Sequence, residues 1–88
     1  MKKIVSVIKP FTMQQNIFVY EDGNKIDALT ANLDNIQEIL LDTAMKYNAN
    51  EIQLVGAKNY SKGIKNKIEE LEISKYNENK IIIDLINS

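Results

Sequence analysis

The stretch of residues 51–71 constrains the fold most, because the spacing of its apolar residues changes once along its length. It opens with a short apolar run that ends at Gly56, which is typical of an interior β-strand. Beyond this glycine the apolar residues recur every three or four positions, which predicts one face of a helix that begins near Asn59 or Tyr60. A strand that enters a helix through a short loop is half of a parallel crossover unit, so the stretch predicts an α/β sheet.

The loop between this strand and this helix is the candidate ligand site. In α/β sheets the carboxyl end of a strand and the N-terminus of the next helix face one crevice, where free N–H groups attract anions. The residues that would line it are Gly56, Lys58, Asn59, Tyr60, Ser61 and Lys62. Because the loop has only Gly56 and Gly63 and no Walker or dinucleotide pattern, a plain turn beside a solvated lysine face is the simpler interpretation.

Three strands are predicted before the first helix. Residues 4–8 are apolar on both faces, which is typical of a central strand, and a proline ends the run. Residues 17–20 and 25–30 flank Asp22-Gly23, which is the strongest hairpin signal in the chain.

A helix and a last strand complete the set of elements. Asp34 and Gln37 have the spacing of a capping box, and the apolar face that follows predicts a helix ending near Tyr47. The second helix is predicted to carry Tyr60, Ile64, Ile68 and Leu71 on its apolar face. Residues 80–86 form the last strand, and its three consecutive isoleucines indicate that both faces are covered.

The predicted order is three strands, a helix, a strand, a helix and a strand, in one domain of residues 1–88. The first three strands would form an antiparallel meander, and the last two would join in parallel through right-handed crossovers. This order resembles the ribonuclease H-like core shared by resolvases, retroviral-type integrases and the halves of actin-like ATPases. The resemblance implies a mixed α/β sheet of five strands with two helices, and a ferredoxin-like α+β sheet is the alternative.

The residues that carry this family's chemistry are missing at the matching positions. Ribonuclease H-like nucleases place an acidic residue on the first strand, which here reads IVSVIK, and another near the end of the fourth, which here reads LVGA. The Asp-x-Gly-type phosphate loop of actin-like ATPases does not match residues 9–12, KPFT. Two-metal phosphoryl transfer needs several converging carboxylates, so the resemblance implies the fold without its chemistry.

Composition excludes several classes of site. The absence of Cys and His removes disulfides, thiolate zinc sites, cysteine nucleophiles and the commonest general base. All eleven basic residues are Lys, so no guanidinium is present to grip phosphate or guanine. The net charge of −1 gives no general attraction to nucleic acid. We therefore expect no enzyme, no catalytic residue, no cofactor, no metal and no nucleic-acid partner.

Local clusters of charge have an ordinary interpretation as solvated surface. One acidic row on the first helix shares a face and could in principle bind a cation: Asp34, Glu38 and Asp42. A lysine cluster on the second helix, Lys58, Lys62, Lys65 and Lys67, is largely cancelled by the acidic Glu69, Glu70 and Glu72, which are read as surface. A degenerate nucleic-acid-binding domain is the third hypothesis for function.

Apolar residues around the first hairpin form the candidate interaction surface: Phe11, Met13, Phe18 and Tyr20. If Phe18 and Tyr20 face outward they expose a patch for a partner chain, and the alternative is that they pack under a helix. The leading hypothesis is a non-enzymatic protein-interaction domain whose partner is another protein or a second copy in a homodimer. A small anionic-ligand or nucleotide-binding module at Gly56–Gly63 is the second hypothesis.

The type of source genome and the cellular location are inferred from composition and from the absence of targeting or membrane-spanning segments. The abundance of Ile, Lys and Asn is typical of AT-biased genes, and the chain resembles small uncharacterised phage or mobile-element proteins. The basic start at Met1 is followed by too short an apolar stretch for a signal peptide, and no run is long enough to cross a membrane. The expected location is the cytoplasm.

Overall fold

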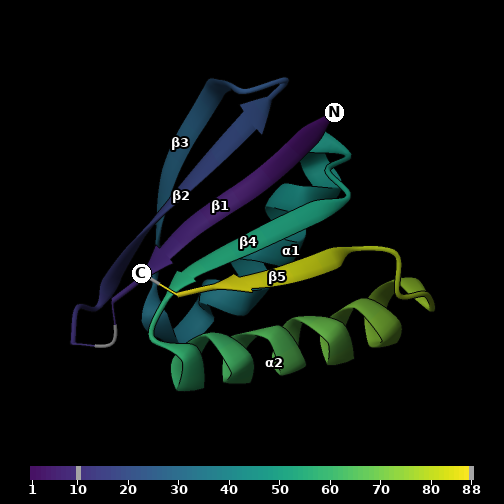
Figure 1. Ribbon diagram of the computed structural model, residues 1–88. Helices are drawn as coiled ribbons and strands as arrows, with labels where there is room; N and C mark the ends of the chain where they lie inside the picture. Colours follow the sequence, from purple (N-terminus) through teal and green to yellow (C-terminus); the bar gives the residue numbers. More distant parts are fainter. Residues whose placement is uncertain (10, 88) are drawn as a thin grey trace.

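The computed structural model describes residues 1–9 and 11–87 (Figure 1). Its elements are β1 (Lys2–Ile8), β2 (Gln14–Glu21), β3 (Asn24–Asn32), the 3-10 turn η1 (Leu33–Asn35), α1 (Ile36–Tyr47), β4 (Glu51–Gly56), α2 (Lys58–Tyr76) and β5 (Ile82–Ile86). The sheet has the order β3-β2-β1-β4-β5; β1 pairs antiparallel with β2, and β2 with β3, while β4 pairs parallel with β1 and β5. The predicted element order, meander and parallel crossovers are confirmed.

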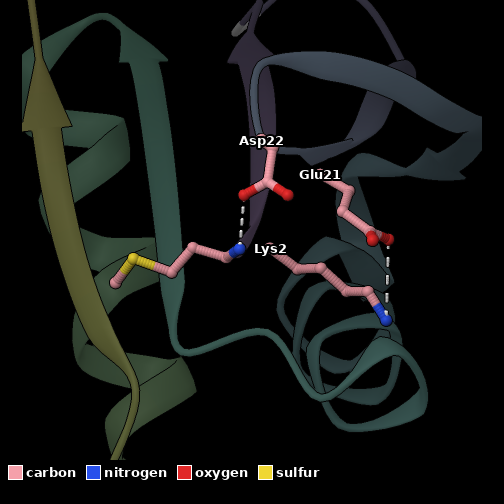
Figure 2. Close-up of polar contacts among 4 residues, drawn as sticks. Lys2, Glu21 and Asp22 are labelled. Atoms are coloured by element: carbon pink, nitrogen blue, oxygen red, sulfur yellow. Dashed lines mark hydrogen bonds and ion pairs between the residues drawn. The ribbon is translucent and has the colours of Figure 1, made fainter.

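The hairpin between β2 and β3 is closed by the predicted Asp22-Gly23 turn. Both residues have positive φ, 52° at Asp22 and 85° at Gly23, which a two-residue type I′ turn requires. Figure 2 shows how this turn is held to the start of β1. The N-terminal ammonium lies 2.7 Å from the Asp22 carboxylate, and the Lys2 ammonium lies 3.8 Å from the Glu21 carboxylate. The register of β1 against β2 is therefore reinforced at this end of the sheet.

Both helices pack on the same face of the sheet (Figure 1). The connections β3-α1-β4 and β4-α2-β5 step across the sheet in one direction, so connections of the same hand place their helices on one side. The core lies between this face and the helices, and its large apolar side chains with 0% exposure are Ile4, Ile17, Val19, Ile36, Leu40, Leu41, Ile52, Leu54 and Ile68. In the described residues neither helix has the length and apolar character needed to span a bilayer.

The helix termini differ in detail from the sequence prediction. The predicted capping box at Asp34 and Gln37 is wrong, because η1 occupies this turn and the Gln37 amide instead donates to the Asp34 backbone carbonyl at 3.4 Å. Helix α2 begins at Lys58, slightly earlier than predicted. Its buried residues are Ser61, Ile64, Ile68 and Glu72. The predicted core position Tyr60 is 46% exposed, because the buried stripe is centred one residue further along the helix.

The prediction that β5 is covered on both faces is wrong. Ile83 is buried against α2, whereas Ile82 is 61% exposed and Ile86 is 39% exposed on the opposite face. The same alternation runs along β1, where Ile4, Ser6 and Ile8 are buried and the residues between them are only partly buried. Among the described residues no helix lies over this second face, which we call the open face.

Candidate functional site

Gly56 occupies the position predicted for it, at the carboxyl end of β4, and its geometry has a structural cause. Its φ of +143° is one that side-chain-bearing residues rarely adopt. A Cβ at this position would lie 2.5 Å from the backbone oxygen of Ile8, its partner on β1. The glycine is therefore required for β1 and β4 to remain paired up to their ends, whether or not a ligand binds nearby.

The six predicted ligand-site residues are not brought together in one site. A cavity of about 630 Å³ lies at the carboxyl ends of the parallel strands, and Gly56 and Lys58 line it together with the β1–β2 loop. A second cavity of about 480 Å³ lies between α2 and the region from η1 to the start of α1, and Asn59 and Tyr60 line that one. Ser61 is buried, and Lys62 lines neither cavity. The predicted ligand site therefore combined residues that line two separate cavities with a residue of the core.

The start of α2 carries no capping side chain. Ala57 is the N-cap residue, and its carbonyl accepts the Ser61 backbone N–H at 3.0 Å. Because alanine offers no oxygen to the first turn, the N–H groups that open the helix have no side-chain partner from the cap. The Ser61 hydroxyl is 1% exposed and, among the described residues, has no hydrogen-bond partner. It lies in the interior and not in the larger cavity.

The wall of the larger cavity opposite α2 is the β1–β2 loop, which is fixed by Gln15. This side chain is 1% exposed, and its amide oxygen accepts the Lys9 backbone N–H at 2.7 Å. Its amide nitrogen donates to the Lys9 carbonyl at 2.8 Å and to the Thr12 carbonyl. Gln15 therefore continues the hydrogen bonding of the sheet beyond β1 and holds the backbone of Lys9 and Thr12, which both line the cavity.

The open face presents apolar side chains that no helix covers among the described residues. Strand registers align its side chains across the sheet, and its apolar members are Val5, Val7, Phe18, Ala28, Val55, Ile82 and Ile86. Lys25 from β3 lies over the Phe18 ring, with its ammonium 5.2 Å from the ring centroid. The charged residues gather toward the amino end of β4, where Glu51 pairs in register with Lys3 on β1.

The four residues of the predicted interaction surface separate into two pairs. Phe18 and Tyr20 are partly buried and lie on the open face, so they do not pack under a helix. Phe11 is 98% exposed and Met13 is 57% exposed, and both belong to the loop beyond the end of β1. Phe18 lies five residue steps beyond Met13 along extended chain, a distance of about 17 Å. The two pairs are therefore different surfaces.

Two neighbouring carboxyl groups lie on the open face, Glu51 on β4 and Asp84 on β5. A hydrogen bond with Asp84 raises the pKa of Glu51 above its ordinary value, and burial and the Asp84 charge raise it further. A hydrogen bond from Gln53 and the charge of Lys3 act in the opposite direction and lower this pKa. In the described residues no group of three or more Asp, Glu, His or Cys side chains is arranged to hold a metal ion.

Glu72 is the polar residue that the sequence analysis placed wrongly. It is 1% exposed on the buried stripe of α2, not on the surface. One carboxylate oxygen accepts the backbone N–H groups of Lys80 and Ile81, each at 3.1 Å. The carboxylate thus fixes the chain immediately before β5. The signal available in the sequence was its helical spacing, because position 72 follows Ile64 and Ile68 in steps of four.

Comparison with known proteins identifies the fold. No protein-family model matches the chain, and no curated protein is significantly similar to it in sequence. A crystal structure from Bacteroides thetaiotaomicron, described as a protein with actin-like ATPase fold and unknown function, matches 97% of this chain with a TM-score of 0.70 and 14% sequence identity. The fold is ribonuclease H-like. The ferredoxin-like alternative does not hold.

The likeness shows the fold alone. This chain spans 32% of the length of the Bacteroides protein, so about two thirds of that protein has no counterpart here. At the carboxyl ends of β1 and β4, where ribonuclease H-like nucleases were expected to carry acidic side chains, this chain has Ile8 and Gly56. Its neighbouring carboxyls, Glu51 and Asp84, lie on the open face, and Glu51 is at the opposite end of β4 from the larger cavity.

Proposed function

We propose that this chain is a non-enzymatic protein-interaction domain whose binding surface is the open face of the sheet. The observation that carries the proposal is the exposure of large apolar side chains on a rigid sheet, above all Ile82, which is 61% exposed. Five strands about 4.8 Å apart and about five residues long present a face of about 400 Å². Polar and apolar side chains share this area, and exposed apolar patches on soluble proteins often mark binding sites.

The chemistry of the face supports a protein partner in preference to a small molecule. Small-molecule sites are concave, whereas a sheet surface is shallow and continuous. An apolar centre at Val5, Val7 and Val55 has charged residues at one end, at Lys3 and Glu51, and polar residues beside apolar ones are typical of protein interfaces. The aromatic residues Phe18 and Tyr20 lie on the same face and supply the residue types that interfaces favour.

A capture experiment with charged variants tests the proposal. Tagged wild-type protein is used as bait in a lysate of the native host, beside a variant with Phe18→Asp and Ile86→Asp on the open face. Phe11→Asp is the matched control, because Phe11 is 98% exposed and belongs to the loop beyond the end of β1. We expect the face variant to lose the captured protein and the control to retain it. Loss of capture in Phe11→Asp alone would move the binding surface to the loop and overturn the proposal.

A small anionic-ligand module is the second candidate, and one observation favours it. The uncapped start of α2 adjoins the cavity of about 630 Å³, whose rim carries Lys9 and Lys58. Phosphate, sulfate and nucleotides are therefore screened by thermal unfolding of the wild type and of Lys58→Gln. A rise in melting temperature that is lost in Lys58→Gln supports this candidate. No stabilisation by any of these anions at millimolar concentration removes it.

A further inference from the structure

We infer that a second copy of this chain occupies the open face, in a symmetric dimer that stacks two sheets with β1 of each copy over β4 of the other. This inference rests on the proposed interaction role of the face and names its partner. Two features of the face carry it, the order of its charges across the strands and the position of its apolar residues.

The charges of the face are divided between two halves of the sheet. At the amino end of β4 the aligned residues, from one edge to the other, are Ile82, Glu51, Lys3, Tyr20 and Lys25. Carboxyl groups occur on β4 and β5, at Glu51 and Asp84, and ammonium groups occur on β1 and β3. The face therefore has an acidic half beside a basic half.

A two-fold axis parallel to the strands and between β1 and β4 makes this face complementary to itself. Rotation about this axis exchanges the two halves and places Lys3 of each copy over Glu51 of the other. Lys3 and Glu51 of the two copies form a ring in which positive and negative charges alternate, so no two like charges face each other. The Lys3 charge already lowers the pKa of Glu51 within one copy, which shows that the two groups lie close enough to interact.

The same rotation matches some of the apolar residues, while it places Phe18 over Asp84 and Asn16 over Ile86 of the other copy. Val7 of each copy lies over Val55 of the other, and Tyr20 lies over Ile82, so the most exposed isoleucine of the face receives an aromatic cover. Two sheets stacked face to face in this way pack about 10 Å apart with their strands nearly aligned. An unrelated partner would need its own complementary charges, whereas a second copy supplies them by symmetry.

The size of the face limits how tightly the dimer binds. Four of the five strands overlap in this arrangement, and β3 extends beyond the contact. The footprint of about 300 Å² per copy, estimated from strand spacing and rise, is smaller than in obligate dimers. A dimer that dissociates at micromolar concentration or above and weakens with added salt is therefore expected.

Complementary charge reversal tests the arrangement, with the mass in solution measured by sedimentation over micromolar to millimolar concentrations. Lys3→Glu places like charges over Glu51 of the other copy, and Glu51→Lys places like charges over Lys3. Each variant alone is expected to raise the dissociation constant at least about tenfold. An equimolar mixture of the two restores opposite charges across both contacts between the copies, so it is expected to form a heterodimer as tight as the wild-type dimer or tighter.

Lys62→Glu is the matched control, because it makes the same charge change on α2, which covers the opposite face of the sheet. Its mixture with Glu51→Lys is expected to give no restoration of the Lys3 contact. Should a charge variant fail to fold, Ile82→Glu inside the contact is compared with Ile26→Glu on β3, where the side chain is 45% exposed. Only Ile82→Glu is expected to abolish the dimer.

The possible outcomes separate this inference from the proposed function. A wild-type protein that stays monomeric to millimolar concentration, or charge-reversed variants whose mixture does not associate, overturns the dimer. If the Phe18→Asp and Ile86→Asp variant still loses a captured host protein in that case, the interaction role of the face stands and the partner is a different protein. Retention of the captured protein by that variant, with no dimer, overturns both.

Discussion

The two faces of the sheet are built from alternating residues of the same strands, yet their environments differ. On β4, Ile52 and Leu54 are fully buried under the helices, whereas Gln53 and Val55 are only partly buried on the open face. On β5, Ile83 is 6% exposed and its neighbour Ile82 is 61% exposed. The composition of a strand therefore does not decide which face is covered; the path of the chain between strands does.

Under the proposed function, this difference gives the two faces separate roles. Both helices pack on one side of the sheet, so the burial of apolar side chains on that side accounts for the stability of the fold. The open face keeps apolar residues that add little to folding in a single copy and are available for association. Substitutions on the covered face should change the free energy of unfolding, and substitutions on the open face should change association.

The largest expected effect compares neighbouring residues on β4 that face opposite sides. Leu54→Ala leaves a cavity under the helices and is expected to lower the free energy of unfolding by about 3–5 kcal/mol. Val55→Ala, on the open face, is expected to lower it by less than about 1 kcal/mol, because the side chain is partly exposed already. Urea denaturation at low protein concentration measures both values. Equal losses would show that the open face is covered in solution.

Much of this fold could be predicted from the periodicity of apolar residues, but which face of the sheet the helices cover could not. The switch at Gly56 identified a strand followed by a helix, and Asp22-Gly23 identified the hairpin, because both signals depend on local backbone geometry. Apolar residues on both faces of β5 were taken to mean cover on both sides. Whether a face of β5 is covered depends on where the helices pack, and the sequence of residues 82–86 does not contain that information.

A buried carboxylate within the covered face gives the next largest effect. Glu72→Ala removes the acceptor for the N–H groups of Lys80 and Ile81 and is expected to cost about 2–4 kcal/mol of unfolding free energy. Glu72→Gln keeps an acceptor oxygen and is expected to lose less. Glu70→Ala on the exposed side of α2 is the control and should stay within about 0.5 kcal/mol. Thermal unfolding compares all three, and an unchanged Glu72→Ala would contradict the role assigned to this carboxylate.

Two glycines sharpen the comparison between a structural requirement and a tolerated position. Gly56→Ala forces a Cβ to 2.5 Å from the Ile8 oxygen at a φ of +143°, and we expect a cost of about 1–3 kcal/mol. Gly63 lies within α2, and a Cβ there would have no heavy atom within 4 Å, so Gly63→Ala should stabilise the protein by about 0.5–1 kcal/mol. Chemical denaturation measures both. Destabilisation by Gly63→Ala would contradict the open space beside it.

The candidate site was only partly predictable, for a related physical reason. Lys58, Asn59, Tyr60 and Ser61 are consecutive in sequence, and the start of a loop–helix unit favours a ligand there. Successive helix residues point in different directions, so these side chains reach two cavities and the core instead of one site. Glu72 was missed because a charged residue among other charged residues resembles surface, and only packing against residues 80–81 shows otherwise.

The smallest expected effect is on the pH dependence of stability. It arises from Glu51, so it tests a polar contact of the open face and leaves the apolar side chains in place. The pKa of Glu51 is raised in the folded state by its hydrogen bond with Asp84, so the folded protein holds this proton more tightly than the unfolded chain does. The resulting stability is fully present below the ordinary pKa of the carboxyl and is lost as the pH rises through the raised value. Asp27 has the opposite sign, because the Tyr47 hydroxyl lowers its pKa and its contribution is lost as the pH falls.

Glu51→Gln isolates the first contribution, since it keeps the shape of the side chain and removes its titration. We expect the variant to gain stability relative to the wild type as the pH rises from about 4 to 7, by a small amount because the Glu51 side chain is partly exposed to solvent. Tyr47→Phe is the control, because it changes the Asp27 contribution at lower pH and leaves the Glu51 window unaltered. Thermal unfolding at a series of pH values gives the difference curve. A flat curve for Glu51→Gln would mean that the hydrogen bond with Asp84 does not raise the pKa of Glu51 in the folded protein.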